Sequence, residues 1–138
     1  MKPSPRRKAR ELAFQAVYSW QISQNSVTDI EVNFLTENAK RRFDIEYFQL
    51  LLRGVTSNVN ELDLAISPHV DRPIDDIDQI EKAILRVAVF ELSDCKDVPY
   101  RVVINEAIEL AKSFAADDSH KFVNGVLDKV VKLVRPQD

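Results

Sequence analysis

The sequence predicts an all-α fold of six or seven helices packed as two helical sub-bundles. Apolar residues recur at helical spacing along most of the chain, and no segment shows the sustained alternation of a β-strand. Only 2 of the 138 residues are glycine. The proline-containing stretch "SPHVDRPIDD" at 67–76 interrupts the helical pattern. We therefore expect a single domain, 1–138, whose two halves span about 1–67 and 76–138.

The first half contains three predicted helices. The first runs over about 4–23, and its core stripe, at about 100° per residue, is Ala9, Leu12, Ala13, Ala16 and Trp20. The second spans about 28–37 and opens with the capping-box pattern Thr28-Asp-Ile-Glu31. The third is a long helix over about 44–66, with an apolar stripe formed by Phe48, Leu51, Leu52, Val55, Val59, Leu62 and Ile66.

The second half also contains three predicted helices. Asp75 or Asp76 is expected to cap a helix over about 77–93. Pro99 precedes a helix over about 100–115, whose wide apolar arc, Phe114 included, predicts burial on two sides. Asp118 or Ser119 caps the last helix, about 119–134, with an inward face of Phe122, Val126, Val130 and Leu133.

The charges are unevenly distributed along the chain. The net charge is −3, yet the first ten residues hold five basic groups and no acid, namely Lys2, Arg6, Arg7, Lys8 and Arg10. The remaining residues carry 14 basic against 22 acidic groups, a net charge of −8. This asymmetry suggests a polyanion at one surface and a basic partner at another. A solvated basic tail is the alternative that charge alone leaves open.

The sequence shows no sign of catalysis, a cofactor or a metal site. The two histidines, His69 and His120, lie far apart, and two glycines cannot build a phosphate-binding loop. The acidic stretch "DDIDQIE" at 75–81 is better explained as a helix N-terminus than as a magnesium site. The single cysteine, Cys95, and the lack of a signal peptide or membrane-span pattern predict a cytoplasmic protein.

Two predicted helices present faces that suit single-stranded RNA. On the first helix, Arg7, Phe14 and Tyr18 lie opposite the core stripe and Arg10 lies at its edge. Guanidinium groups bind phosphates and aromatic rings stack on unpaired bases. Burial of this face under a neighbouring helix is the alternative: it is favoured for Phe14 and is as plausible as exposure for Tyr18.

The last helix presents a lysine-bearing face that contains a glycine. Lys121, Lys129 and Lys132 lie along it with Asn124, and Gly125 falls between the lysines and Phe122. A glycine inside a helix suggests close approach by a neighbouring backbone or by a ligand. Packing against a neighbouring backbone is the favoured explanation of the two.

Three stretches resemble the NusB family of transcription antitermination factors. They are "RRKARELAFQAVYSWQ" near the start, "VPYRVVINEAIELAKSF" at 98–114 and "SHKFVNGVLDKV" at 119–130. The resemblance spans nearly the whole chain. It implies an all-helical protein that binds the boxA element of nascent RNA, notably ribosomal RNA, together with the small ribosomal subunit protein NusE. Within the antitermination complex of RNA polymerase, this pair helps the enzyme resist termination.

The resemblance also implies which residues contact RNA and protein. The implied RNA-binding residues are Lys2, Arg6, Arg7, Lys8, Arg10, Tyr18, Asp118, Ser119, Lys121 and Phe122. The implied protein-partner residues are Glu81 and Asp78, on the helix that contains "QIEKAILR". Two other functions stay open: the RNA-binding helical domain that begins some ribosomal RNA methyltransferases, and a helical adaptor that binds only protein.

Overall fold

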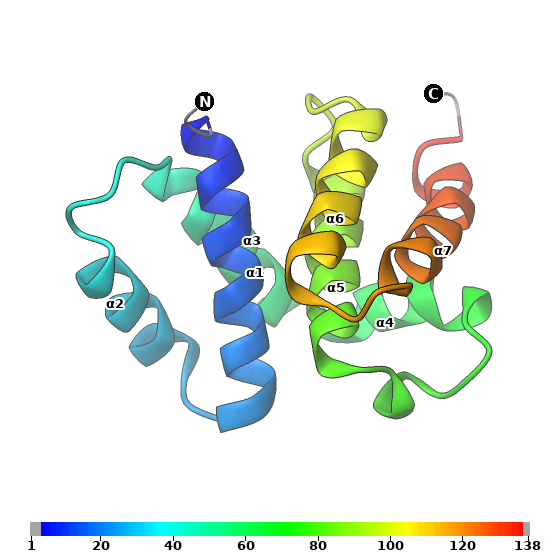
Figure 1. Cartoon of the computed structure of the whole chain (residues 1–138), viewed down its shortest axis with the longest axis horizontal. Helices are drawn as coiled ribbons and strands as arrows, with labels where there is room; N and C mark the ends of the chain where they lie inside the picture. Colours follow the sequence, from blue (N-terminus) through cyan, green and yellow to red (C-terminus); the bar gives the residue numbers. More distant parts are fainter. Residues whose placement is uncertain (1–3, 137–138) are drawn as a thin grey trace.

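The computed structural model describes residues 4–136, and these form seven α-helices and two short 3-10 helices without a β-strand (Figure 1). The prediction of an all-α fold with six or seven helices is confirmed. In chain order the elements are α1 (Pro5–Ser23), α2 (Val27–Glu37), α3 (Ile45–Ser57), α4 (Val59–Ile66), η1 (Ser67–His69), η2 (Ile74–Asp76), α5 (Gln79–Asp94), α6 (Tyr100–Phe114) and α7 (Ser119–Val134).

Helix α5 is the centre of the fold. Figure 1 shows α1, α2 and α3 on one side of it, α7 on the other and α6 in front, and α5 contacts α1, α3, α4, α6 and α7. Every residue from Glu81 to Leu92 is buried. The sequence predicted only a stripe here, whereas a helix enclosed by five others is buried all round. The division into halves at 1–67 and 76–138 stays a prediction.

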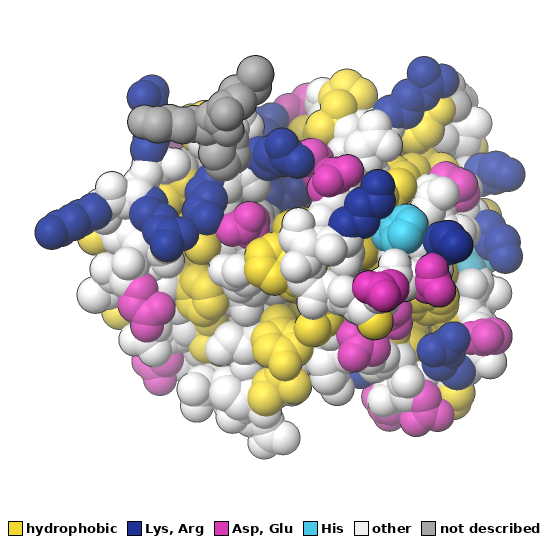
Figure 2. Space-filling view, in the orientation of Figure 1, with side chains coloured by type: hydrophobic (Ala, Val, Ile, Leu, Met, Phe, Trp, Pro, Cys, Tyr) yellow, Lys and Arg dark blue, Asp and Glu magenta, His cyan; other side chains and the backbone are white. Residues whose placement is uncertain are grey.

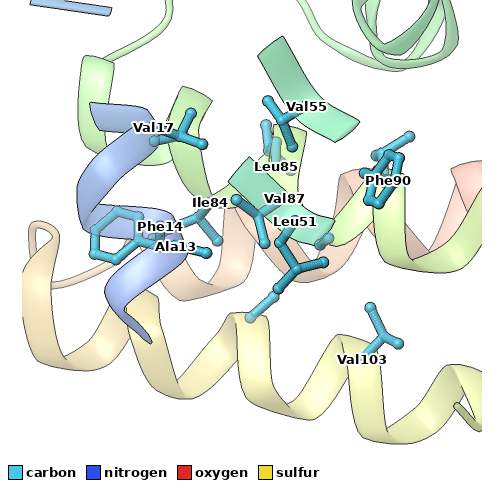
Figure 3. Close-up of a cluster of buried hydrophobic side chains, with 14 of the residues drawn as sticks. Ala13, Phe14, Val17, Leu51, Val55, Ile84, Leu85, Val87, Phe90 and Val103 are labelled. Carbon is cyan, nitrogen blue, oxygen red and sulfur yellow. The ribbon is translucent and has the colours of Figure 1, made fainter. Parts of the chain in front are cut away.

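The hydrophobic core joins α5 to the helices around it. Figure 3 shows side chains from α1, α3, α5 and α6 meeting in it, among them Phe14, Leu51, Ile84 and Val103. The predicted stripe of α1 is buried except for Trp20, which is partly buried. Its alanines are small enough to let α1 lie close against α3 and α5.

Three predicted helix boundaries are wrong, each for a local reason. The expected long helix over 44–66 is divided at Asn58, whose side chain Nδ2 donates to the carbonyl oxygen of Gly54 at 2.8 Å. Ser26, and not Thr28, caps α2 by accepting from the backbone N–H of Asp29 at 3.1 Å. Asp78 caps α5, because Asp75 and Asp76 lie in the separate turn η2 (Ile74–Asp76).

The buried face of α7 lies further round the helix than predicted. Val123 and Leu127, which are not part of the predicted inward face, are fully buried, while Leu133 of that face is 63% exposed. Phe122 is partly buried. The apolar pattern of this helix is wide enough to fit two orientations, and contact with both α5 and α6 selects one of them.

Arg135 ties the end of α7 to the end of α5. Its buried guanidinium donates to the carbonyl oxygens of Leu92 at 2.8 Å, Cys95 at 3.0 Å and Val98 at 2.7 Å. The last carbonyls of a helix have no partner within the helix, and a cation there is favoured by the helix dipole. Arg135 therefore supplies donors to the C-terminal end of the central helix.

The two glycines differ in how closely other atoms approach them. A Cβ on Gly54 would overlap the ring of Phe90, so this glycine allows α3 and α5 to pack closely. A Cβ on Gly125 would have no described atom within 4 Å. The favoured explanation of Gly125, packing against a neighbouring backbone, is therefore wrong.

We expect Gly54→Ala to destabilise the protein. Overpacking against Phe90 costs about 1–3 kcal/mol, and the better helix propensity of alanine returns up to about 1 kcal/mol. The expected net loss, about 1–2 kcal/mol in the free energy of unfolding, is measured by urea denaturation. A variant as stable as the parent protein would show that Phe90 moves aside freely.

Candidate nucleic-acid interface

Helices α1 and α6 lie side by side on one face of the protein (Figure 1). Arg7 Nε lies 3.0 Å from Glu106 Oε1, and two turns further along α1 the rings of Phe14 and Phe114 lie 5.3 Å apart. Because both sequence numbers increase from the first contact to the second, the two helices run in the same direction. The start of α7 follows α6 after a short turn, so the three stretches that carry the family resemblance lie on adjacent helices.

We call Arg6, Arg7 and Lys8 the basic cluster. Helix α1 begins in front of it because Ser4 Oγ accepts from the backbone N–H of Arg7 at 3.1 Å and Pro5 occupies the first turn. These residues therefore belong to a helix and not to a tail, and Figure 2 shows dark-blue side chains around the start of α1. Lys2, the other implied RNA contact of this end, lies outside the described residues.

Each member of the basic cluster has a partner at the surface. The Arg6 guanidinium lies 4.3 Å from the ring centre of Tyr47, and its Nη1 is 4.0 Å from a carboxylate oxygen of Asp97. Lys8 Nζ donates to Glu11 at 2.8 Å, and Arg7 pairs with Glu106. The side chains of Arg6 and Arg7 are about half exposed, at 46% and 51%. Exposed ion pairs contribute little stability, so phosphates can replace these carboxylates at small cost.

Arg10 is buried, and its predicted place at the edge of an outward face is wrong. Its side chain is 6% exposed, and Nε and Nη2 donate to the two carboxylate oxygens of Glu91 at 2.7 and 2.9 Å. The hydroxyl of Tyr47 donates to the same carboxylate at 2.6 Å, and Arg10 Nη1 reaches Glu106 at 3.4 Å. Wheel geometry on α1 could not find this pair, because its partner is on α5. The one sequence signal was an acid directly after the mostly apolar stretch "AILRVAVF".

The pKa shifts agree with a charged arginine and a neutral tyrosine in this network. Burial opposes the charge on Arg10, but the hydrogen bond and charge of Glu91 outweigh burial and raise the pKa of Arg10. Burial, together with the charge of Glu91, raises the pKa of the Tyr47 hydroxyl far above its ordinary value. Burial also raises the pKa of the Cys95 thiol, which keeps it protonated. Tyr47 therefore remains a hydrogen-bond donor to Glu91 at all ordinary pH values.

Two aromatic rings are exposed beside the α1–α6 contact. Phe14 is buried, as the favoured interpretation had it, whereas Tyr18, one turn beyond it on α1, is 36% exposed. Phe114 was predicted to lie in the buried arc of α6, and that prediction is wrong, since the residue is 37% exposed. Its ring contacts that of Phe14, and the exposed part of the side chain can contact a ligand. Sequence reasoning missed Phe114 because its position on the helix suited the core.

The turn before α7 brings together polar and aromatic residues of the motif "DSHKF". Ser119 is buried, whereas Asp118 and Lys121 are highly exposed and form an ion pair at 3.5 Å. The carboxylate of Asp118 makes no capping hydrogen bond to α7. The guanidinium of Arg72 lies 5.1 Å from the ring centre of Phe122. Asp118, Lys121 and Phe122 can therefore reach a ligand directly, and Ser119 supports the turn.

The two implied protein-partner residues differ in how they are used. The carboxylate of Asp78 accepts from the backbone N–H groups of Ile80 and Glu81 at 3.0 and 3.1 Å and is thus a helix cap. Glu81 is only 9% exposed, and its carboxylate forms no hydrogen bond or ion pair within residues 4–136, although its charge contributes to raising the pKa of Arg72. A carboxylate so placed favours an external cation.

A hollow of about 580 Å³ lies close to the start of α5. Lys82 and Arg86 of α5 line it with residues of α1 and α4, and Arg86 pairs with Asp63 at 2.8 Å. Exposed apolar side chains lie on the same two helices, Ile22 on α1 and Leu64 on α4. A concave polar surface beside exposed apolar groups is typical of a protein-binding site.

Residues 4–136 contain neither a metal-binding cluster nor a membrane-spanning helix. No three or more His, Cys, Asp or Glu side chains among these residues are grouped so as to hold a metal ion. Across the same residues, the helices are too short or too polar to cross a membrane.

Comparison with known proteins gives one consistent result. The NusB family pattern matches residues 7–132. The transcription antitermination protein NusB of Colwellia psychrerythraea is 83% identical over 138 residues, which cover 100% of both chains. The NusB of Tolumonas auensis is 61% identical over 132 residues, or 96% of each chain.

Solved structures share the fold. A structure of T. maritima NusB is 33% identical with a TM-score of 0.82, and the match covers 96% of this chain and 93% of the other. In a crystal structure of the antitermination factors NusB and NusE in complex with double-stranded RNA, the matching chain is 28% identical with a TM-score of 0.84. That match covers 92% of this chain and 96% of the other.

We expect Arg10→Ala and Arg7→Ala to differ sharply in stability. Loss of Arg10 leaves the buried Glu91 carboxylate without its cation, which costs about 3–5 kcal/mol. Loss of the exposed Arg7 costs under about 1 kcal/mol. Urea denaturation of the two variants measures the difference. Equal losses would contradict the structural role assigned to Arg10.

Proposed function

The chain belongs to the NusB family and is a transcription antitermination factor, and we propose that its α1–α6–α7 face binds the single-stranded boxA-type RNA of nascent transcripts. Ribosomal RNA transcripts are the main targets. The protein acts with the small ribosomal subunit protein NusE to help RNA polymerase resist termination. The similar chain that was crystallised with NusE and double-stranded RNA supports both kinds of partner. Of the functions that the sequence left open, antitermination is favoured because the 83% identical relative matches over its full length.

One observation carries the assignment of the RNA surface. Exposed arginines and exposed aromatic rings lie on the same pair of parallel helices, with Arg6 and Arg7 near the start of α1 and Tyr18 and Phe114 further along. In this arrangement the arginines bind successive phosphates and the rings stack on unpaired bases. Lys8, Asp118, Lys121 and Phe122 extend the surface at its two ends.

Arg10 and Ser119 act by positioning other residues. Arg10 shares Glu106 with Arg7 and, through Glu91, holds Tyr47 beneath Arg6. Ser119 is buried within the turn that displays Asp118 and Lys121. We propose that both residues affect RNA binding through the shape of the surface, without touching the RNA.

The protein-binding surface lies at the start of α5. Glu81 is our candidate for an ion pair with a basic residue of the ribosomal protein, because its carboxylate has no hydrogen bond or ion pair within the described residues, and the residue as a whole is 9% exposed. Asp78 contributes by fixing the first turn of α5. The hollow lined by Lys82 provides a concave shape for such an interface. The exposed side chains of Ile22 and Leu64 provide apolar area.

The protein acts by binding alone, without turning over a substrate, and it acts in the cytoplasm, where the nascent transcript is made. Antitermination requires only that the RNA and the ribosomal protein be held near the polymerase. Hydrolysis or transfer of a nucleotide by the pure protein would contradict this part of the proposal.

Replacing Arg6 and Arg7 by glutamine should make RNA binding less sensitive to salt. Each phosphate contact on a single strand contributes about 0.7 to the slope of log affinity against log salt, so the slope should fall by about 1.4. Fluorescence anisotropy with a short uridine- and adenine-containing RNA at several salt concentrations measures it. An unchanged slope would place the phosphates elsewhere.

Tyr18→Ala should weaken RNA binding by about 1–3 kcal/mol, since the stacked base loses its platform. The melting temperature should change little because Tyr18 is one of the exposed aromatic residues. Tyr18→Phe is the matched control and should bind RNA normally. Loss of stability with intact RNA binding would assign Tyr18 to packing.

Glu81→Gln should weaken binding of the basic ribosomal protein by about 2 kcal/mol or more, because the partner's cation becomes buried without its carboxylate. RNA binding by the free protein should not change. Glu37→Gln, at an exposed position of α2, is the control. Isothermal titration decides the matter, and an unchanged dissociation constant would remove Glu81 from the interface.

A further inference from the structure

Gly125 lies in the interior of α7 (Ser119–Val134) without a reason inside the chain. It is exposed, its φ is not positive, and an added Cβ would have no described atom within 4 Å. Neither packing nor backbone conformation therefore requires glycine here. Alanine would be a better helix former at this position. The reason for glycine is then expected in something that α7 binds.

The surroundings of Gly125 indicate the chemistry of that ligand. Lys121 and Lys129 lie one turn before and one turn after it, and Lys132 lies two turns after it on the same exposed face. Lys129 and Lys132 have no ion pair or hydrogen bond among the described residues, and Lys121 has only an exposed pair with Asp118. Figure 2 shows dark-blue side chains on the right of the molecule, over α7.

We propose that the sugar–phosphate backbone of the RNA lies directly on α7 at Gly125, with Lys121, Lys129 and Lys132 binding the phosphates on either side. This inference rests on the proposed RNA-binding function and extends its surface from the "DSHKF" turn along α7. Glycine permits a ligand backbone to approach the helix closely. Any side chain at position 125 would hold the strand away from the helix and lengthen its distance to the lysines.

The charge of this face favours RNA over a protein partner. Lysine is depleted in protein–protein interfaces, whereas it is a common phosphate ligand. Asp128 is the one exposed acid within the helix on this face, against three lysines. Lysine ammonium groups on flexible side chains can bind phosphates without reading the base sequence. A stripe of this kind serves to hold a strand whose bases are read elsewhere.

The test is Gly125→Ala, since it should move stability and RNA affinity in opposite directions. The melting temperature should rise by about 3–5 °C because alanine is the better helix former. The dissociation constant for a short uridine- and adenine-containing single-stranded RNA should rise by about five- to tenfold. Asn33→Ala, at an exposed position of α2, is the matched control: it also improves helix propensity and should leave RNA affinity unchanged.

Lys129→Gln provides a second test of the RNA position that does not depend on the glycine. It should reduce the salt slope of RNA binding by about 0.7. The inference is overturned if Gly125→Ala is more stable yet binds RNA as tightly as the parent protein. It is also overturned if Gly125→Ala weakens only the ribosomal protein, because α7 would then be a protein-binding face.

RNA binding by the parent protein distinguishes failure of this inference from failure of the proposed function. If the parent protein binds RNA through Arg6 and Arg7 and ignores the change at Gly125, only the present inference fails. If the parent protein does not bind the RNA at all, the proposed RNA-binding function fails with it.

Discussion

The buried pair between Arg10 and Glu91 is the interaction on which the outward face of this protein depends. Moving two charges into a helical core is expensive unless every polar atom is satisfied. Here the guanidinium binds the carboxylate with two nitrogens, and the Tyr47 hydroxyl occupies one of the same oxygens. The three residues come from α1, α5 and α3, so the pair fixes these helices relative to one another.

The exposed arginines are arranged around that pair. Arg6 lies over the ring of Tyr47, and Arg7 shares the carboxylate of Glu106 with Arg10. A buried, fully bonded group thus orients two exposed cations that make only weak surface pairs of their own. Cations that are held in place but paired only weakly suit a phosphate-binding surface. Binding of a phosphate then breaks only weak ion pairs and orders few side chains.

Arg135 performs a related task at the other end of the chain. Its hydrogen bonds to the last carbonyls of α5 hold the end of α7 against the same central helix that carries Glu91. Helices α1 and α7 are therefore both fixed to α5, although they are far apart in the sequence. The RNA surface that we propose on α1, α6 and α7 therefore depends on α5 without including any of its residues.

The sequence predicted what depends on local pattern and missed what depends on distant partners. Helical spacing was sufficient for the fold class and for the alanine stripe of α1. It could not show that Arg10 is buried, because the carboxylate responsible is 81 residues away. Phe114 was misplaced for the same reason, since the ring that it contacts, Phe14, belongs to another helix.

The central claim is that RNA lies on the α1–α6–α7 face, and the most direct measurement is an amide chemical-shift map of the labelled protein with a boxA-type RNA. The largest changes should fall at the start of α1, at the end of α6 and along the exposed face of α7 through Gly125. The exposed side of α2 should be unaffected. Changes concentrated on α2 and α3, with α1 and α7 silent, would contradict the account.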